Sequence, residues 1–315
     1  MNRQNMPTLD KDRITNFNEV SQGYTLDMAI QEAKRCLQCK HKPCVKGCPV
    51  NIEIPAFIQK ITENDLDGAL ETITENNLFP AICGRVCPQE LQCEKVCVRG
   101  IKGESVAIGN LERFIGDNAN SHKPIDIKEN HIKVAIVGSG PSGLTCANEL
   151  RKLGYEVTIF EALHLPGGVL AYGIPEFRLP KDIVQKEIDK LTNMGVKIMT
   201  NVVIGKSLTI DQLKSEGYKA IYIASGAGLP KFLCINGENY NGVFSANEYL
   251  TRINLMKSYQ INSNTPIYPS KNVCVIGGGN VAMDAARCAK RMGTDNVYIV
   301  YRRGKEEMPA RKEEV

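Results

Sequence analysis

The chain has 315 residues, of which 43% are hydrophobic and 23% are charged, and its formal net charge is +4. This length and composition bury enough apolar surface for two or three domains, which excludes a disordered segment and a small disulfide-stabilised module. The net charge is small and the basic residues are spread among acids, so nucleic acid is not an expected partner.

Neither a secretory signal nor a membrane span is predicted. Residues 1–17 are polar and mixed in charge, and no later run approaches the roughly 20 apolar residues that cross a bilayer. Twelve cysteines in such a chain favour metal or redox chemistry over disulfides, because reducing compartments keep thiols free. We therefore expect a cytoplasmic protein with no membrane partner.

The N-terminal part of the chain is predicted to be a small α-helical domain over residues 1–118. Apolar residues at helical spacing follow Thr25, a potential cap, as far as Leu37, and they recur between residues 66 and 73. Eight of the twelve cysteines also fall in this part. The polar stretch 119–131, which shows no apolar period, is predicted to be a linker.

The cysteine spacing predicts two [4Fe-4S] clusters in this domain. The first group is close to the bacterial ferredoxin run, in which three cysteines bind one cluster and a fourth, before a proline, binds its neighbour. Structural zinc is the alternative, and the Cys-Pro ends and the lack of a second Cys-x2-Cys pair disfavour it. The two groups are Cys36-x2-Cys39-x4-Cys44-x3-Cys48-Pro49 and Cys83-x3-Cys87-Pro88-x4-Cys93-x3-Cys97.

The four other cysteines are scattered singly through apolar segments. Free cysteine behaves as a small hydrophobic residue, so we expect them to be buried. They are Cys146, Cys234, Cys274 and Cys288.

A βαβ unit is predicted after the linker, with strands at residues 132–137 and 156–160 around a helix at 144–153. Its turn, Gly138-Ser-Gly140-Pro-Ser-Gly143, matches the dinucleotide fingerprint: a tight turn, close approach of the backbone to a pyrophosphate, and close helix packing. Glu161 follows the second strand, where an acid can accept hydrogen bonds from a ribose diol.

A second βαβ unit runs from residue 272 to residue 301, with the turn Gly277-Gly-Gly279-Asn-Val-Ala282. Where a site for NAD(H) has a carboxylate, this chain has Arg302 and Arg303, which favours NADP(H) because guanidinium groups can bind a 2′-phosphate. Arg311 is a weaker candidate for the same phosphate. The alternative is an ordinary solvated basic corner.

Between Tyr24 and Phe114 the chain resembles the cluster domain of glutamate synthase small subunits and dihydropyrimidine dehydrogenases. The resemblance is carried by Ala-Ile-Cys83-Gly-Arg-Val-Cys87-Pro and Ile108-Gly-Asn-Leu-Glu112-Arg-Phe. It implies interleaved ligand sets, with Glu112 as a non-cysteine ligand, whereas spacing alone favours Cys83 as the eighth ligand. The implied sets are Cys36, Cys39, Cys44 and Cys97 for one cluster, and Cys48, Cys87, Cys93 and Glu112 for the other.

The same resemblance continues into the nucleotide-binding part and implies an FAD site there. Gly168 and Arg178 lie in the segment that resembles the flavin side of that family, and Gly226 lies in a strand and turn that resemble its second FAD contact. The implied fold is α plus α/β: the helical domain, an FAD-binding domain at residues 132–245, and the start of an NADP(H)-binding domain at 246–315. Because one βαβ unit cannot close such a domain, we expect a longer polypeptide.

The resemblance implies that NADPH reduces FAD and that single electrons leave through the clusters. No catalytic side chain is predicted, because the cofactors supply the chemistry. The implied partner is the glutamate synthase large subunit, which makes glutamate from glutamine and 2-oxoglutarate, or another electron-accepting subunit. Two alternatives are the equivalent subunit of an electron-bifurcating NADH-dependent ferredoxin:NADP oxidoreductase and an inactive, truncated binding module.

Overall fold

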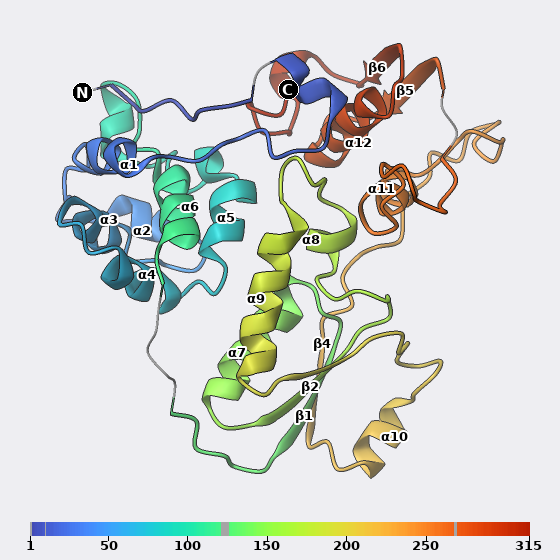
Figure 1. The fold of residues 1–315 in the computed structure, drawn as a ribbon, viewed down its shortest axis with the longest axis horizontal. Coiled ribbons are helices and arrows are strands. Elements are labelled where there is room, and N and C mark those ends of the chain that lie inside the picture. Colours follow the sequence, from blue (N-terminus) through green and yellow to red (C-terminus); the bar gives the residue numbers. More distant parts are fainter. Residues whose placement is uncertain (1, 10, 121–125, 268–269) are drawn as a thin grey trace. The chain divides into compact units, whose positions relative to one another are not determined.

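The computed structural model describes residues 2–9, 11–120, 126–267 and 270–315, and the chain divides into two compact units (Figure 1). Unit 1 consists of Met1–Asp10 and Glu19–Pro124, and unit 2 of Lys11–Asn18 and Ile125–Val315. The division after residue 124 falls in the predicted linker, of which residues 121–125 lie outside the described part. The assignment of Lys11–Asn18 to unit 2 was not predicted.

Unit 1 is α-helical, as predicted. Two of its helices are capped by side-chain oxygens: Thr25 Oγ1 accepts from the Met28 amide at 3.3 Å, and Asp65 Oδ1 accepts from the Gly68 amide at 3.0 Å. The helices are α1 (Leu26–Ala33), α2 (Pro43–Gly47), α3 (Ile54–Thr62), α4 (Leu66–Thr74), α5 (Pro80–Val86) and α6 (Ile108–Asn118), with short 3₁₀ turns η2 (Gln89–Leu91) and η3 (Val98–Ile101).

The core of unit 1 lies between α1, α3, α4 and α6, where Phe57, Ile61, Ile73 and Ile115 have no exposed surface. The first helix is shorter than predicted: α1 ends at Ala33, and Leu37, which was expected on its apolar face, is 53% exposed. The chain leaves the helix there because it must turn to form the first cysteine loop, in which Gln38 has a φ of 47°.

The first sheet of unit 2 is parallel, with the strand order β3-β2-β1-β4. Helix α7 (Pro141–Lys152) connects β1 to β2, packs on both strands and contacts α9 (Lys181–Asn193). This is the parallel βαβ arrangement that the first βαβ pattern predicts. The strands are β1 (Lys133–Val137), β2 (Glu156–Phe160), β3 (Lys197–Met199) and β4 (Ala220–Ile223), and the short helices are α8 (Val169–Tyr172) and α10 (Ile210–Ser215).

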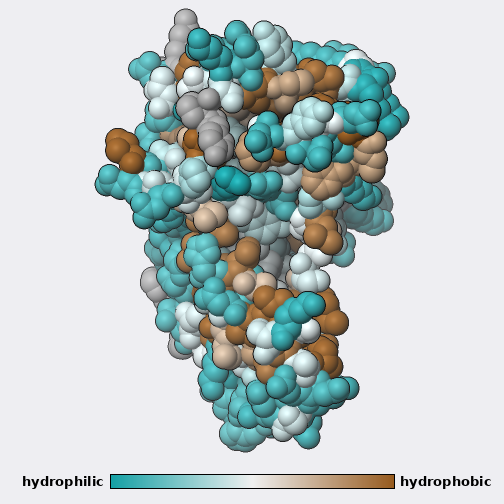
Figure 2. All heavy atoms as spheres, turned by 90° about the vertical axis from the view of Figure 1, so that its right-hand side faces the viewer, coloured by the Kyte–Doolittle hydropathy of each residue, from teal (hydrophilic) through white to brown (hydrophobic). Residues whose placement is uncertain are grey.

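The second sheet of unit 2 pairs β5 (Asn272–Ile276) and β6 (Asn296–Val300) in parallel, with α12 (Asn280–Arg291) between them in the chain. Helix α11 (Ala246–Asn254) and η1 (Lys11–Thr15) pack against α12, and η4 (Lys305–Glu307) follows β6. In the space-filling view, hydrophobic patches interrupt a largely hydrophilic surface (Figure 2). Among the described residues, no helix has the length and apolar character needed to cross a membrane.

The four scattered cysteines do not behave alike. Cys288 is buried in α12, as predicted, and Cys146 is partly buried. Cys234 and Cys274 are exposed, so the prediction of burial is wrong for these two. Cys274 alternates with buried Val275 along β5, which explains its exposure because successive side chains of a strand point to opposite faces.

Candidate iron-sulfur and dinucleotide sites

Four cysteines from separate parts of unit 1 line a single pocket. Three of them come from the loop after α1 and from α2, and Cys97 comes from the residue that precedes η3. The rest of the lining is mostly apolar and includes Ile54, Ile58 and Ile108. The four cysteines, Cys36, Cys39, Cys44 and Cys97, are the set that the family resemblance assigns to one cluster.

Arg35 explains how Cys97 is brought to the other three. Its guanidinium pairs with Glu32 and donates to the carbonyl oxygens of Glu104 at 2.7 Å and Ser105 at 3.0 Å. Glu32 in turn accepts a hydrogen bond from the Ala107 amide at 2.8 Å. The end of α1, next to Cys36, is therefore bonded to the segment that follows η3. Arg35 is 3% exposed, so these bonds are shielded from water.

The donor set of this pocket suits an iron–sulfur cluster. Burial, with smaller effects from Cys36 and Cys97, raises the pKa of the Cys44 thiol to about 11, so a bound metal must displace its proton. Among the described residues, no three Cys, His, Asp or Glu side chains meet closely enough for a single metal ion. A four-iron cubane is larger than one ion, and its ligands must stand around a cavity.

A second group of cysteines gathers near α5 and α6. Burial raises the pKa of Cys93, and the charges of Glu94, Glu112, Cys48 and Cys87 raise it further, which means that these groups lie near one another. The pKa of Cys83 is raised by burial first and then by Glu112, Cys87 and Cys48. The structure therefore brings together the three cysteines of the second predicted set and both candidates for its fourth ligand.

Glu112 and Cys83 share one partner, Asn77. Its side-chain amide donates to Glu112 Oε1 at 2.6 Å, and its carbonyl oxygen lies 3.5 Å from Cys83 Sγ, within range of a thiol hydrogen bond. Burial raises the pKa of Glu112 to about 8, against the smaller opposite effect of the Asn77 hydrogen bond. Because both side chains face the same site, the choice between Glu112 and Cys83 stays a prediction.

The first glycine loop has the geometry that a dinucleotide pyrophosphate requires. Gly138 has a φ of 102°, and a Cβ on Gly143 would stand 2.0 Å from the Gly138 carbonyl oxygen, so neither position accepts another residue without distortion. A Cβ on Gly140 would meet nothing within 4 Å, which leaves space at the start of α7 for a phosphate.

Glu161 and Gly168 both lie beside this loop. The Glu161 carboxylate follows β2, is buried, and accepts from the amides of Ser139 at 2.9 Å and Leu163 at 2.8 Å. Gly168 packs on Gly140 so closely that a Cβ on Gly168 would stand 2.7 Å from the Gly140 Cα. Gly226 follows β4 with a φ of 71°, and its Cβ position is open.

Arg178, a predicted cofactor residue, pairs with acids of the second βαβ part. Its guanidinium contacts Asp284 Oδ2 at 2.5 Å and Glu314 Oε1 at 2.8 Å, and Asp284 lies on α12. Burial raises the pKa of Asp284 to about 6, although Arg178 and Arg287 oppose that rise. No local sequence pattern indicates this pairing, because Arg178 and Asp284 are 106 residues apart.

The second glycine loop is covered by the segment that follows β6. The Ala310 amide donates to the Gly278 carbonyl oxygen at 3.1 Å, and the Arg311 amide donates to Asn280 Oδ1 at 2.9 Å. Gly277 has a φ of 139°, and a Cβ on Gly279 would meet nothing within 4 Å. Ala282 opens α12 and is buried.

The predicted phosphate-binding arginines do not behave alike. Arg302 and Arg303 are exposed directly after β6. The guanidinium of Arg311 is largely buried and contacts Glu313 at 2.8 Å, and the Arg311 backbone amide donates to Asn280 beside the glycine loop.

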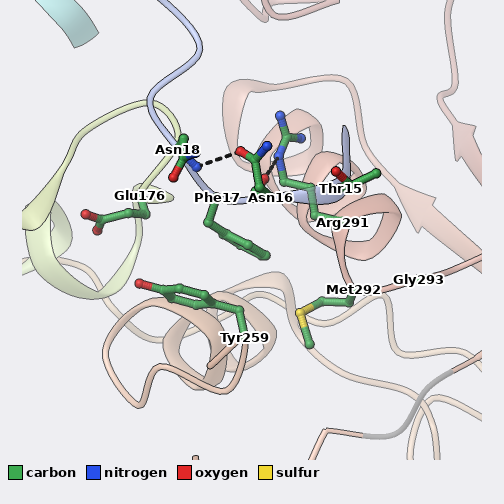
Figure 3. A pocket seen from close by; sticks show the side chains of 9 residues that line it. All are labelled: Thr15, Asn16, Phe17, Asn18, Glu176, Tyr259, Arg291, Met292 and Gly293. Atoms are coloured by element: carbon green, nitrogen blue, oxygen red, sulfur yellow. Dashed lines mark hydrogen bonds between the residues drawn. The ribbon is translucent and has the colours of Figure 1, made fainter. Parts of the chain in front are cut away.

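Unit 2 also contains a cavity of about 600 Å³ that sequence reasoning missed (Figure 3). Phe17 enters it from the N-terminal segment and stacks on Tyr259 with ring centroids 4.3 Å apart. Arg291, at the end of α12, donates from Nε to the Asn16 carbonyl oxygen at 2.9 Å. Phe17 is an aromatic residue in a polar segment, which is the one signal that could have indicated this packing.

Two family models together match most of the chain. One, described as dihydropyrimidine dehydrogenase domain II with a 4Fe-4S cluster, matches residues 13–124, and the other, described as pyridine nucleotide-disulphide oxidoreductase, matches residues 132–315. The chain belongs to the pyridine nucleotide-disulphide oxidoreductase family. Within this family it carries an iron–sulfur domain ahead of the nucleotide-binding part.

Relatives of known role support this assignment. The chain is 38% identical to the NAD-dependent dihydropyrimidine dehydrogenase subunit PreT of Salmonella typhimurium, over 95% of this chain and 71% of that protein. It is 34% identical to the small chain of NADPH glutamate synthase from Azospirillum brasilense, over 96% of this chain and 65% of that one. A solved structure of FprA, a Mycobacterium tuberculosis oxidoreductase described with a modified NADP⁺, matches with a TM-score of 0.50 and 28% identity, covering 59% of this chain and 46% of that one.

The family assignment confirms the predicted resemblance and fold class. The chain is an iron–sulfur flavoprotein oxidoreductase, and the predictions of 4Fe-4S clusters, FAD and NADP(H) as cofactors are confirmed at the level of the family. The individual ligand residues stay predictions, since family membership does not by itself test them.

Proposed function

We propose that this chain is the NADPH-oxidising subunit of a glutamate synthase and that it delivers electrons to a large subunit in the cytoplasm. The observation that carries the choice is the pair Arg302–Arg303, exposed directly after β6 where a site for NAD(H) has an acid. The similarity to an NADPH glutamate synthase small chain supports the same choice. When bound, FAD takes a hydride from NADPH and releases single electrons, which clusters accept one at a time.

In this proposal the chain's own residues bind and orient the cofactors. The amides at the start of α7, opened by Gly140, bind the FAD pyrophosphate, and Glu161 exchanges its present hydrogen bonds for the ribose. Gly279 and Ala282 open the second site, and Arg302 and Arg303 bind the 2′-phosphate of NADPH.

The proposal also assigns the cluster ligands. One cluster is held by the four cysteines that line the pocket in unit 1, and the other by the cysteine group at α5 and α6 with Glu112. Cys83 is then a neighbour of the second cluster. Glu112 must lose its proton to bind iron, which the charge of the cluster irons would favour.

Anaerobic purification of the native complex tests the partner. We expect a large companion subunit, and formation of glutamate that requires NADPH, glutamine and 2-oxoglutarate together. If a different companion is recovered and glutamine is not consumed, the glutamate synthase assignment is wrong, although the chain remains an oxidoreductase.

A second candidate is a subunit of an NAD-dependent dihydropyrimidine dehydrogenase, favoured by the higher identity of 38% to PreT. The two candidates predict different nucleotides. Rapid-mixing measurements of flavin bleaching with NADPH and with NADH distinguish them, because the second candidate requires that NADH reduce the flavin faster.

A further inference from the structure

The pocket ringed by Cys36, Cys39, Cys44 and Cys97 reaches the protein surface at an apolar patch. Leu37 and Val98 line this pocket, yet they are 53% and 37% exposed. Ile101 is 77% exposed. Large apolar side chains gathered at such exposure are typical of interaction sites.

Secondary structure places two of these residues on one side. Val98 and Ile101 are the first and last residues of η3, and a 3₁₀ helix has three residues per turn, so side chains three apart eclipse each other. Ile101 therefore extends the apolar surface that Val98 begins at the pocket. In a buried helix both side chains would face the core, whereas here both are exposed.

The two segments that form this pocket mouth carry more exposed basic residues than acids. Residues 34–46 contain the exposed lysines Lys34, Lys40, Lys42 and Lys46, and residues 95–104 contain Lys95, Arg99 and Lys102 with one exposed acid, Glu104. The whole chain has a net charge of only +4, so this is a local concentration. Lys42 pairs with Glu53, whereas Lys40 and Lys102 are exposed; Lys40 is three residues after Leu37 in the chain, and Lys102 follows Ile101 directly.

We propose that this surface, made by Leu37, Val98, Ile101, Lys40 and Lys102 and called here the cluster-mouth surface, docks an acidic partner protein that receives electrons from the first cluster. An apolar centre with a basic rim fits a partner surface that has an apolar centre and an acidic rim. Charge complementarity of this kind steers the encounter of two proteins. The inference rests on the proposed electron-transfer function. It adds to that function the exit point and the charge of the acceptor.

The transfer itself is a one-electron step. In each transfer the reduced cluster would lose one electron and the docked acceptor would gain it. One NADPH, oxidised to NADP⁺ with release of a proton, would supply through FAD the two electrons for two such transfers. No bond forms or breaks. A short path is the requirement, and the cluster-mouth surface supplies it because Leu37 and Val98 belong both to the pocket lining and to the surface.

The test compares two one-electron acceptors of similar size and opposite charge, acidic cytochrome b5 and basic cytochrome c, with the cluster-loaded, flavin-loaded chain and NADPH. We expect the rate with cytochrome b5 to exceed that with cytochrome c at low salt and to fall as salt is added. The double variant Lys40→Glu with Lys102→Glu should lower the cytochrome b5 rate about tenfold and raise the cytochrome c rate. Ile101→Ser should lower the rate with both.

Three controls keep the outcomes separate. The double variant Lys206→Glu with Lys219→Glu, an equal charge reversal at two exposed lysines of unit 2, should change neither rate. The cluster potentials, measured by redox titration followed by electron paramagnetic resonance, should stay the same in the Lys40 and Lys102 double variant. Binding of cytochrome b5 to the fully oxidised chain, which involves no turnover, should weaken in the Lys40 and Lys102 double variant.

Several results would overturn the proposal. Equal effects of the Lys40 and Lys102 double variant and of the Lys206 and Lys219 double variant would mean that only the overall charge matters. Shifted potentials with unchanged cytochrome b5 binding would mean that the lysines merely balance the cluster charge. Slower reduction of the clusters by the flavin would make this surface an internal contact of the chain. If NADPH fails to bleach the flavin of the unaltered chain, the proposed function itself fails.

Discussion

Arg302 and Arg303 carry the nucleotide choice at the scale of single residues. Both are exposed after β6, so their removal should leave the fold intact. Replacing both with Ser should raise KM for NADPH about 10-fold to 100-fold, because a charge-assisted hydrogen bond contributes roughly 1.5–3 kcal/mol. Steady-state kinetics with both nucleotides check this, and KM for NADH serves as the control. Equal losses for NADH would show that these residues do not read the 2′-phosphate.

Lys181 gives a pH dependence that can be measured. Burial lowers its pKa to about 8, from about 10.5, against the opposite effects of Glu176, Asp284 and Cys288. Its Nζ donates to the carbonyl oxygens of Ile174 and Leu179, both at 2.7 Å. As the pH rises above about 8, the folded chain releases the proton before the unfolded chain does, so the free energy of unfolding gains from this residue.

Urea unfolding of the original chain and of Lys181→Met should reveal this contribution. Above pH 8 the unfolding free energy of the original chain should rise relative to that of the variant by roughly 1 kcal/mol per pH unit, and below pH 7 the difference should be flat. A difference that falls with pH would contradict the lowered pKa.

At the scale of elements, the turn between β1 and α7 contains one glycine needed for FAD binding and another needed for the fold. Gly140 has room for a Cβ and an ordinary φ of −71°, so Gly140→Ala should fold normally and lose FAD, because the methyl group occupies the space for the pyrophosphate. Gly143→Ala places a Cβ 2.0 Å from a carbonyl oxygen. Unlike Gly140→Ala, it should therefore destabilise the fold, by roughly 1–3 kcal/mol, as well as lose FAD. The flavin content and the unfolding temperature of each variant, compared with those of the original chain, check these two predictions. If Gly140→Ala retains FAD at full occupancy, the assigned phosphate position is wrong.

The elements of unit 1 were predictable only in part. The helix at α1 follows from apolar spacing and the Thr25 cap, and the helix at α4 from apolar spacing, since these signals lie within a few residues. Leu37 fits the same spacing but lies beyond the helix end, because the cysteine loop requires the chain to turn. Apolar periodicity alone does not predict where a helix ends when the following residues form a binding site.

At the scale of the whole molecule, all predicted cluster ligands lie in unit 1 and both glycine loops lie in unit 2. Cluster formation supplies folding free energy to the unit that holds the ligands. Removal of iron by a chelator should therefore lower the unfolding temperature of unit 1 on the order of 10 °C and leave that of unit 2 unchanged. Calorimetry before and after chelation, with flavin fluorescence as the probe of unit 2, checks this. Simultaneous loss of flavin would show that the units unfold together.

By itself, the sequence determined what short segments do. The two strand, glycine turn and helix units, the acid after β2 and the arginines after β6 follow from spacings of a few residues. Cysteine spacing predicted the clusters, the arginines predicted NADP(H), and the family resemblance predicted FAD. Only the tertiary structure showed that Arg35 bonds the end of α1, next to Cys36, to the segment after Cys97 and η3. It also placed Cys83 and Glu112 around Asn77, paired Arg178 with Asp284, and hydrogen-bonded Ala310 to Gly278. These contacts join residues far apart in the chain, and their geometry depends on how helices and loops pack, which local pattern does not record.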